Sequence, residues 1–381
     1  MRPAPAYFIA CHIGDDYGPQ FALRNHLVKR RASFVFVTCP FDFARVPAAR
    51  LERYEQGQCV ETVVGHANRS KGVVSWVKDV LFVLAAGLRW CGRRTQFIGI
   101  NNLHASVGVL LRWLKRCQSV VYYIVDYTPR RFPSRVLNLV YQRLARFAGR
   151  HADCLWAVSE RIKRVYTAWG AAEPASLVVP IGLDPEDISV AEPGQVERNT
   201  LVVVSTLFEN KGVQLAIEAL PALPGARLKI IGVGPYADAL RGLARSREVE
   251  DRVAFLGHLD RKALFAEVAR SRIALATYVA DAANYSYYAD SAKPKEYLAC
   301  GVPTVITRVP WIAELIAEKP MGLAIEYRVE ELVAACRRLF EDDALWRTCR
   351  ENALRFSQGQ TWEAIYDAAL SRTGAGRGRT A

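Results

Sequence analysis

The strongest constraint on the fold is a repeated rhythm of short, almost continuously apolar segments, each followed by a segment with helical spacing. Residues 6–14, 33–41 and 119–129 are such apolar segments in the first half, and residues 226–235 and 272–279 are examples in the second half. Strands that are apolar on both sides and alternate with helices are typical of parallel sheets covered on both faces. The sequence therefore predicts an α/β protein built from doubly wound, Rossmann-like sheets.

The rhythm is interrupted once, by a polar stretch with Pro and Gly at residues 185–199. A chain of 381 residues is long enough for two domains. We therefore predict an N-terminal Rossmann-like domain at 1–184, a linker at 185–199 and a second Rossmann-like domain at 200–355. Two such domains would face each other across a cleft at the carboxyl ends of their strands.

The last part of the chain has a different composition. Residues 356–371 have helical spacing with an aromatic stripe of Phe356, Trp362 and Tyr366, which predicts a helix. Residues 372–381 are rich in Gly and Arg, which predicts a disordered tail.

The net charge of +13 is unevenly distributed along the chain. From Met1 to Pro185 there are 26 Lys and Arg against 12 Asp and Glu, whereas the remainder carries 25 against 26. This asymmetry indicates that the N-terminal half meets an anionic partner, for which an acidic bilayer surface, a pyrophosphate-linked lipid and nucleic acid are candidates. The alternative is a solubilising charge that has no partner.

The most membrane-like window, residues 72–92, is uncharged only from Val80 to Leu88, far short of the roughly 20 residues that span a bilayer. It fits a helix packed on a sheet, or an interfacial helix with Trp76 and Trp90 at its rims. The chain does not open on an apolar leader, so no signal peptide is expected. Nine scattered cysteines without a CxxC pair favour a reducing compartment. We expect a cytoplasmic protein with possible peripheral association to the inner face of the membrane.

The stretch SAKPKEYLACGVPTVIT, residues 291–307, combines a short helix with a following strand. Gly301 and Pro303 end the helix, and Ser291 and Asp290 stand where N-cap residues belong. A helix start at the carboxyl side of a strand favours anions, and Lys293 and Lys295 add positive charge. Glu296, about one turn in, is placed to accept hydrogen bonds from hydroxyls such as those of a ribose.

Two further turns follow strands in the same half of the chain. Lys211 and Gly212 stand between a strand end and a helix start, and Gly232 follows the strand at 226–231. A lysine there can pair with a diphosphate, and glycine lets a backbone approach closely. The three turns together predict a nucleotide site in the C-terminal domain.

In this order, the KG pair, LKIIGVGP, VAFLGHL and KEYLACGVPTVIT resemble the nucleotide-binding half of group 1 glycosyltransferases, which have GT-B architecture and mostly retain anomeric configuration. VVYYIVDYTPRRF, WAVSERI and VVPIGLD resemble the N-terminal half more loosely. The resemblance implies transfer of a sugar from a nucleotide-diphosphate donor to a hydroxyl of a saccharide or lipid-linked acceptor, in cell-surface polysaccharide or glycolipid synthesis. It assigns Lys211 to the donor diphosphate, Glu296 to the ribose and Gly18 to an N-terminal loop near the phosphates. It also implies that the helix at 356–371 crosses back to the N-terminal domain.

Two positions depart from the family pattern. Thr206 stands where the family usually has an arginine, so that phosphate contact is either missing or supplied from elsewhere, with Lys293 as the candidate. Tyr288 stands where the first of two paired glutamates is usual, so the acidic contact to the sugar is lost or moved to Asp290 or Asp281. The Lys-x-x-Glu-Tyr form at 293–297 resembles a variant subgroup, which favours a variant enzyme.

The acceptor side offers two candidates. Asp126 ends a strand where the cleft floor is expected, and His104 follows the strand that ends near Asn101. Either could orient or deprotonate an acceptor hydroxyl, although His104 fits a buried structural histidine equally well. The sequence lacks a DxD triplet, so neither a metal nor another cofactor is expected. Fixed donors would then neutralise the leaving group.

Two other functions remain open from the sequence. A GT-B-like protein without activity could bind an anionic partner through its basic half, and a sugar-nucleotide epimerase could use the same fold. Nucleic acid is not expected as a partner, because no RNA-binding motif is visible in the sequence.

Overall fold

The computed structural model describes residues 4–14, 17–41, 44, 46–67, 72–280 and 285–375. The chain divides into two compact α/β units. Unit 1 comprises Met1–Pro180 together with Ile365–Ala381, and unit 2 comprises Ile181–Ala364.

Unit 1 is built on an eight-stranded sheet with the order β4-β3-β2-β1-β5-β6-β7-β8. Its strands are β1 (Tyr7–Ile13), β2 (Phe34–Pro40), β3 (Ala48–Glu55), β4 (Gln58–Ala67), β5 (Gln96–Ile100), β6 (Ser119–Ile124), β7 (Cys154–Ala157) and β8 (Ser176–Val178). The six strands from β2 to β8 in this order pair in parallel, as predicted. Every residue of β2 and β5 is buried, as their near-continuous apolar sequences predict.

The hairpin of β3 and β4 adds an antiparallel edge that the sequence did not predict. In β3 only alternate residues such as Ala49 and Leu51 are buried, and most residues of β4 are exposed. The two strands mix charged, polar and apolar residues, so this edge lacks the continuous apolar runs that identify the other strands.

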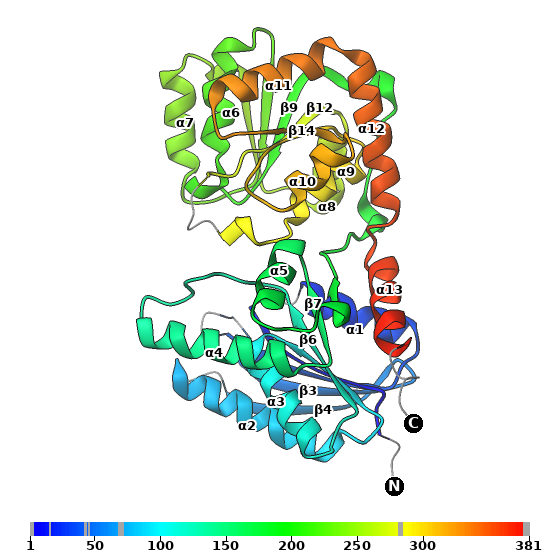
Figure 1. Ribbon diagram of the computed structural model, residues 1–381. Helices are drawn as coiled ribbons and strands as arrows, with labels where there is room; N and C mark the ends of the chain where they lie inside the picture. The colour runs from blue at the N-terminus through cyan, green and yellow to red at the C-terminus, as the bar shows by residue number, and fades with distance from the viewer. Residues whose placement is uncertain are drawn as a thin grey trace. The chain divides into compact units, whose positions relative to one another are not determined.

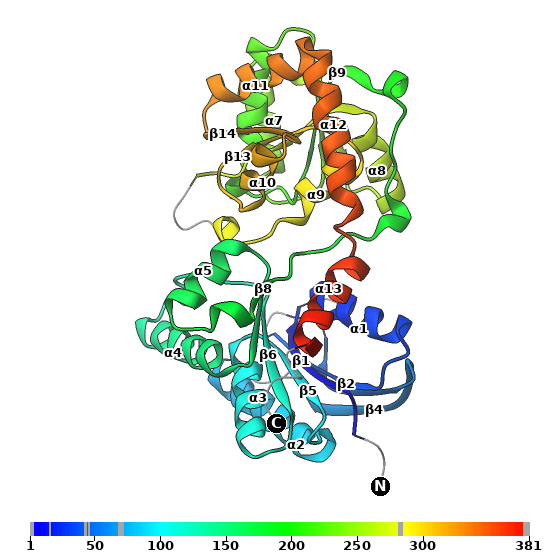
Figure 2. The same cartoon turned by 45° about the vertical axis from the view of Figure 1, so that its right-hand side comes forward.

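Helices cover both faces of the sheet of unit 1. They are α1 (Pro19–Lys29), α2 (Val73–Trp90), α3 (Asn102–Trp113), α4 (Arg135–His151), α5 (Glu160–Ala168) and α13 (Trp362–Ala375), with a 3-10 turn η1 (Glu173–Ala175). α13 lies beside α1, and the Tyr366 hydroxyl donates to the Pro19 carbonyl at 2.6 Å (Figures 1 and 2). On the opposite face, α3 packs against both α2 and α4. Within the part of the chain that the structure describes, no helix is both long and apolar enough to cross a bilayer.

Unit 2 has a six-stranded parallel sheet with the order β11-β10-β9-β12-β13-β14. Its strands are β9 (Glu197–Val204), β10 (Arg227–Ile231), β11 (Val253–Gly257), β12 (Ser271–Ala276), β13 (Thr304–Thr307) and β14 (Gly322–Ile325). The strand order reverses between β9 and β12. In open α/β sheets this switch point is where ligands bind, at the carboxyl ends of the strands.

Two apolar clusters hold the helices of unit 2 against the two faces of its sheet. The helices are α6 (Val213–Ala219), α7 (Ala237–Ser246), α8 (Arg261–Ala269), α9 (Ala292–Ala299), α10 (Ile312–Glu318), α11 (Val329–Glu341) and α12 (Asp343–Gln358), with 3-10 turns η4 (Glu209–Lys211), η5 (Leu220–Ala222), η6 (Glu250–Arg252) and η7 (Tyr285–Tyr287). α6, α7 and α11 contribute to one cluster, and α8, α9 and α10 contribute to the other. α12 packs along α9 (Figure 2).

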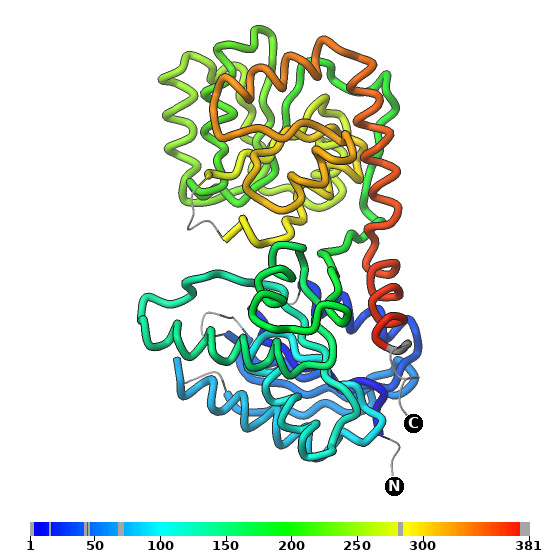
Figure 3. Tube along the Cα trace, in the orientation of Figure 1, coloured from blue at the N-terminus to red at the C-terminus, as the bar shows by residue number. Residues whose placement is uncertain are grey.

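The predicted boundaries differ from the observed elements in three places. The predicted linker at 185–199 contains the 3-10 turns η2 (Pro185–Asp187) and η3 (Pro193–Gln195), and β9 already begins at Glu197. The predicted helix at 356–371 is two helices, because α12 ends at Gln358 and α13 begins at Trp362 (Figure 3). The predicted disordered tail is wrong for residues 372–375, which continue α13, whereas 376–381 lie outside the described residues.

The break between α12 and α13 is caused by contacts with residues 182 and 183 of unit 2. The Leu183 amide donates to the Gln360 carbonyl at 2.7 Å, and the Trp362 amide donates to the Leu183 carbonyl at 3.3 Å. Gly182 fits against the Trp362 indole, where an added Cβ would come within 2.6 Å of the ring. This pairing with residue 183 takes the place of continued helical bonds at residues 360–362.

Candidate functional site

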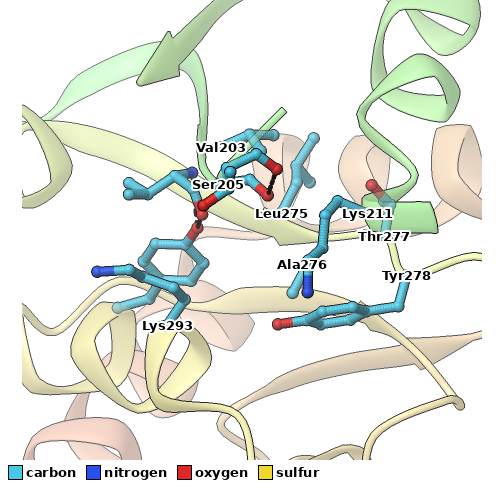
Figure 4. Close-up of a pocket in the computed structure, with 11 residues that line it drawn as sticks. Val203, Ser205, Lys211, Leu275, Ala276, Thr277, Tyr278 and Lys293 are labelled. Carbon is cyan, nitrogen blue, oxygen red and sulfur yellow. Dashed lines mark hydrogen bonds between the residues drawn. The ribbon is translucent and has the colours of Figure 1, made fainter. Parts of the chain in front are cut away.

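A pocket of about 140 Å³ lies at the switch point of unit 2, where β9 and β12 end (Figure 4). Ser205 and Thr206 follow β9, and Thr277 and Tyr278 follow β12. Lys211 and Lys293 also line the pocket from separate elements, and the Lys293 side chain extends away from Lys211 (Figure 4). Hydroxyls together with lysine ammonium groups suit an anionic ligand.

Lys211 is the last residue of the 3-10 turn η4, between β9 and α6, as the sequence predicts. Its Nζ donates to the Tyr285 hydroxyl at 2.6 Å and lies 5.5 Å from the ring centroid of Tyr278 and 4.8 Å from that of Tyr285. These cation–π contacts hold an ammonium group without neutralising it. Lys211 therefore keeps its charge available to a bound anion.

Helix α9 brings Ser291, Lys293 and Glu296 to the same side of unit 2. Ser291 is the N-cap residue, as predicted, although its side chain makes no capping bond. The Lys293 Nζ donates to the Glu296 carboxylate at 2.6 Å, and the Glu296 side chain is 13% exposed. Lys293 lines the pocket and Glu296 does not, so Glu296 is connected to the pocket through its pair with Lys293.

The predicted roles of Asp290 and Lys295 at the ligand site are wrong, because the structure buries both side chains. Lys295 is 1% exposed and Asp290 0%, and they form an ion pair. The Lys295 Nζ also donates to the Ile181 carbonyl at 2.7 Å, and the Ile181 amide donates to Asp290 at 2.6 Å. Burial lowers the pKa of Lys295, and the facing carboxylate partly offsets this effect. Asp290 is therefore not placed to contact a sugar, and Lys295 adds no charge to the anion site.

Gly212 and Gly232 bring the turns of unit 2 against the strands that line the pocket. Gly212 has φ of 72°, and an added Cβ would lie 1.5 Å from the Thr277 carbonyl oxygen. Gly232 has φ of 133°, and its Cβ would lie 1.9 Å from the Ser205 carbonyl oxygen. Both positions require glycine for close backbone approach. Their direct contact with a ligand stays a prediction.

A second and larger pocket, of about 630 Å³, lies in unit 1 where β1, β5 and β6 end. Gly18, the N-cap residue of α1, lines it, as does Asp126, which follows β6. The Asp126 carboxylate is 54% exposed and accepts a hydrogen bond from Arg131 at 2.8 Å. Asp126 therefore lies two residues after the end of β6 and lines this pocket of unit 1, and its part in orienting an acceptor stays a prediction.

The predicted catalytic role of His104 is also wrong, because its side chain cannot reach a substrate. The residue is 0% exposed, and its ring centroid lies 4.5 Å from that of His12. Burial holds the pKa of His104 well below its usual range, so the ring stays neutral. Its backbone amide donates to the Asn101 side chain at the start of α3. Burial agrees with a structural His104 and not with a catalytic one, although both ring nitrogens are buried without a hydrogen-bond partner in the part of the chain that the structure describes.

The two departures from the family pattern have different surroundings. Thr206 lines the pocket together with Lys293, as expected if this lysine replaces the usual arginine. Tyr288 follows η7 and contacts Tyr287 edge to face, with ring centroids 5.0 Å apart. Asp281, the other candidate for the acidic contact, lies outside the described residues.

The sequence did not predict two residues of these pockets, Tyr278 and Arg131, or the Tyr285 beside Lys211. Tyr278 and Tyr285 surround Lys211, and Arg131 pairs with Asp126. The signals were present as a tyrosine-rich loop at 285–288 and as a carboxylate and a guanidinium five residues apart in DYTPRRF.

The comparison with known protein families concerns the C-terminal part of the chain. The family described as Glycosyl transferases group 1 matches residues 185–356. Glycogen synthase of Mycobacterium tuberculosis is 28% identical over 58% of this chain and 59% of that protein. The GDP-mannose-dependent alpha-(1-6)-phosphatidylinositol monomannoside mannosyltransferase of the same species is 30% identical over 36% of this chain and 37% of its own length. The chain thus spans about three fifths, or less, of these curated relatives.

The fold comparison covers nearly the whole chain. The crystal structure of Anabaena HepE in complex with UDP matches with a TM-score of 0.73, at 16% identity, over 97% of this chain and 99% of that chain. The two parallel-sheet units therefore define a protein of the GT-B fold class. Residues 185–356 belong to the group 1 glycosyltransferases, as the sequence motifs predict.

Proposed function

We propose that this protein is a glycosyltransferase that moves a sugar from a nucleotide-diphosphate donor to a hydroxyl of a saccharide or lipid-linked acceptor, with retention. The observation that carries the proposal is the cationic pocket at the switch point of unit 2, inside the part of the chain that belongs to the group 1 family. HepE, which shares the fold, was crystallised with UDP.

In this mechanism Lys211 and Lys293 neutralise the charge that develops on the leaving diphosphate. Preorganised charges that face a developing negative charge are usually the largest catalytic contribution. Lys211 exchanges the neutral Tyr285 hydroxyl for a phosphate oxygen, and Glu296 accepts hydrogen bonds from the ribose hydroxyls. The mechanism assigns no step to a metal or other cofactor. Asp126, which is exposed in the pocket of unit 1, orients the acceptor hydroxyl.

A panel of UDP-, GDP- and dTDP-sugars, each assayed for released nucleotide with and without saccharide acceptors, tests the activity. We expect one nucleotide to raise the unfolding temperature and its sugar conjugate to be turned over. A nucleotide that stabilises the protein without turnover of any conjugate would favour a binding protein without activity. Conversion of the donor to an isomeric sugar nucleotide, without transfer, would favour an epimerase.

The proposal places the enzyme at the cytoplasmic face of an anionic membrane. Support comes from the basic N-terminal half and from exposed aliphatic side chains on α2 and α4, among them Val74, Leu81 and Val136. Liposomes with anionic lipid should sediment the protein at low salt, and the bound fraction should fall as ionic strength rises. Lack of sedimentation at low salt would reject membrane association and leave the transfer chemistry unaffected.

A further inference from the structure

The pocket of unit 1 has walls that a free saccharide would not require. We propose that it binds the aliphatic chain of a lipid-linked acceptor, so that the acceptor is amphipathic and not a free sugar. This inference rests on the proposed glycosyl transfer, and it names the acceptor class for that reaction.

One wall of the pocket is an apolar stripe of helix α4. Leu137, Val140, Tyr141 and Leu144 all line the cavity. Their spacing places them on one face of the helix, which is the pattern of a helix that packs against an apolar partner. In this structure the stripe faces a cavity of about 630 Å³.

Aromatic rings that contact this stripe extend the apolar lining. Trp76 of α2 contacts Phe132 with ring centroids 5.3 Å apart, and Phe132 contacts Tyr141 at 6.1 Å. Phe41, after β2, also lines the cavity. Rings of this kind bury methylene groups well, whereas sugar hydroxyls require many hydrogen-bonding partners.

Polar groups gather at the strand ends of the same cavity. The Asp126–Arg131 pair and the Asn101 side chain provide donors and acceptors there. A ligand that matches the whole lining therefore has a polar head at the strand ends and an apolar tail along α4. That combination describes a lipid-linked acceptor.

The apolar lining continues onto the outer surface of unit 1. Val140 lines the cavity and is 48% exposed, and its neighbours Val136 and Leu139 on α4 are 68% and 53% exposed. On α2, Val73 and Val77 flank Trp76 and are 54% and 51% exposed. A chain longer than the cavity would meet these aliphatic side chains and lose part of its contact with water along the outer surface of α4 and α2.

Charge on α4 agrees with a lipid-linked occupant. Its sequence, RVLNLVYQRLARFAGRH, contains arginines and no acidic residue. A basic helix with an aliphatic stripe suits an acceptor that is held at an anionic lipid surface.

The test measures binding of n-alkyl β-glucosides with hexyl, octyl and decyl chains by calorimetry, below their micelle-forming concentrations. Wild-type protein should bind more tightly with each added methylene, by up to about fourfold per group when the group is fully buried. The n-alkyl phosphates form a second series, which shows whether the head beside Arg131 is a sugar or a phosphate. Either series with a chain-length dependence supports the proposal.

Two matched variants show where the chain binds. Val140→Asp places a carboxylate in the cavity wall, whereas Val60→Asp places one on the exposed β4, at a valine of similar exposure that does not line the cavity. We expect the chain-length dependence to be lost in V140D and kept in V60D. Equal dependence in both variants, or its absence in wild type while free oligosaccharides bind, would overturn the proposal.

The result for the lipid chain can be distinguished from the result for the proposed glycosyl transfer. Thermal stabilisation by nucleotide and turnover of the donor depend on unit 2 and are measured on the same variants. Donor turnover without chain-length dependence would remove the lipid acceptor and leave a glycosyltransferase. Chain-length dependence without donor turnover or nucleotide binding would remove the transferase and leave a lipid-binding pocket.

Discussion

Replacing Lys211 with alanine is expected to lower kcat/KM for sugar transfer by about a hundredfold or more, the loss seen when one preorganised donor to a developing negative charge is removed. Lys211 is the cation held against Tyr278 and Tyr285 at the switch point of unit 2. The steady-state rate of nucleotide release with the donor identified by the panel measures the effect.

Lys262→Ala is the matched control, because Lys262 is an exposed lysine on α8 of the same unit and does not line the pocket. Its kcat/KM should stay within about twofold of wild type, since surface substitutions away from a site have small effects. Undiminished transfer in K211A would refute the assignment of the diphosphate to this pocket.

Breaking the buried Asp290–Lys295 pair is expected to destabilise unit 2 strongly. Lys295→Ala leaves the Asp290 carboxylate buried without its cation, and loss of one partner of a buried pair costs about 3–5 kcal/mol. The pair also holds Ile181 through its amide and carbonyl groups, so those bonds weaken too. Urea denaturation followed by circular dichroism measures the change in the free energy of unfolding.

Two controls distinguish this effect from a general loss of charge. Arg261→Ala removes the exposed pair with Asp187, in which both side chains are about half exposed, and should cost less than about 1 kcal/mol. The double variant Lys295→Met with Asp290→Leu should recover stability relative to K295A, since it leaves no buried charge. Equal stability of K295A and wild type would contradict the description of a buried pair.

Most of the fold could be predicted because its signals are local. Strands such as β2 and β12 are buried along their whole length, so their sequences are apolar and easily recognised. The edge hairpin of β3 and β4 was missed because most residues of β4 face solvent and β3 is buried only at alternate positions, so neither strand is continuously apolar. The break between α12 and α13 was missed because residue 183, distant in sequence, bonds to residues 360 and 362.

The candidate site likewise contains residues whose positions the sequence predicts and residues whose positions it does not. Lys211 stands in a turn fixed by its neighbours in sequence, and it lines the pocket as predicted. Lys295 stands two residues from Lys293 and looks equivalent in the sequence, yet it is buried. The burial of Lys295 depends on its contact with the Ile181 carbonyl, 114 residues away, and the sequence around position 295 does not indicate that contact. The aromatic walls beside Asp126 likewise come from separate elements that only the folded sheet brings together.

The most direct measurement is a crystal structure of the protein with the nucleotide diphosphate that the panel identifies. Our account predicts diphosphate oxygens within hydrogen-bonding distance of the Lys211 ammonium, with its bond to Tyr285 released, and the ribose hydroxyls on Glu296. A nucleotide bound away from the ends of β9 and β12, or a Glu296 side chain that does not touch it, would contradict the central claim.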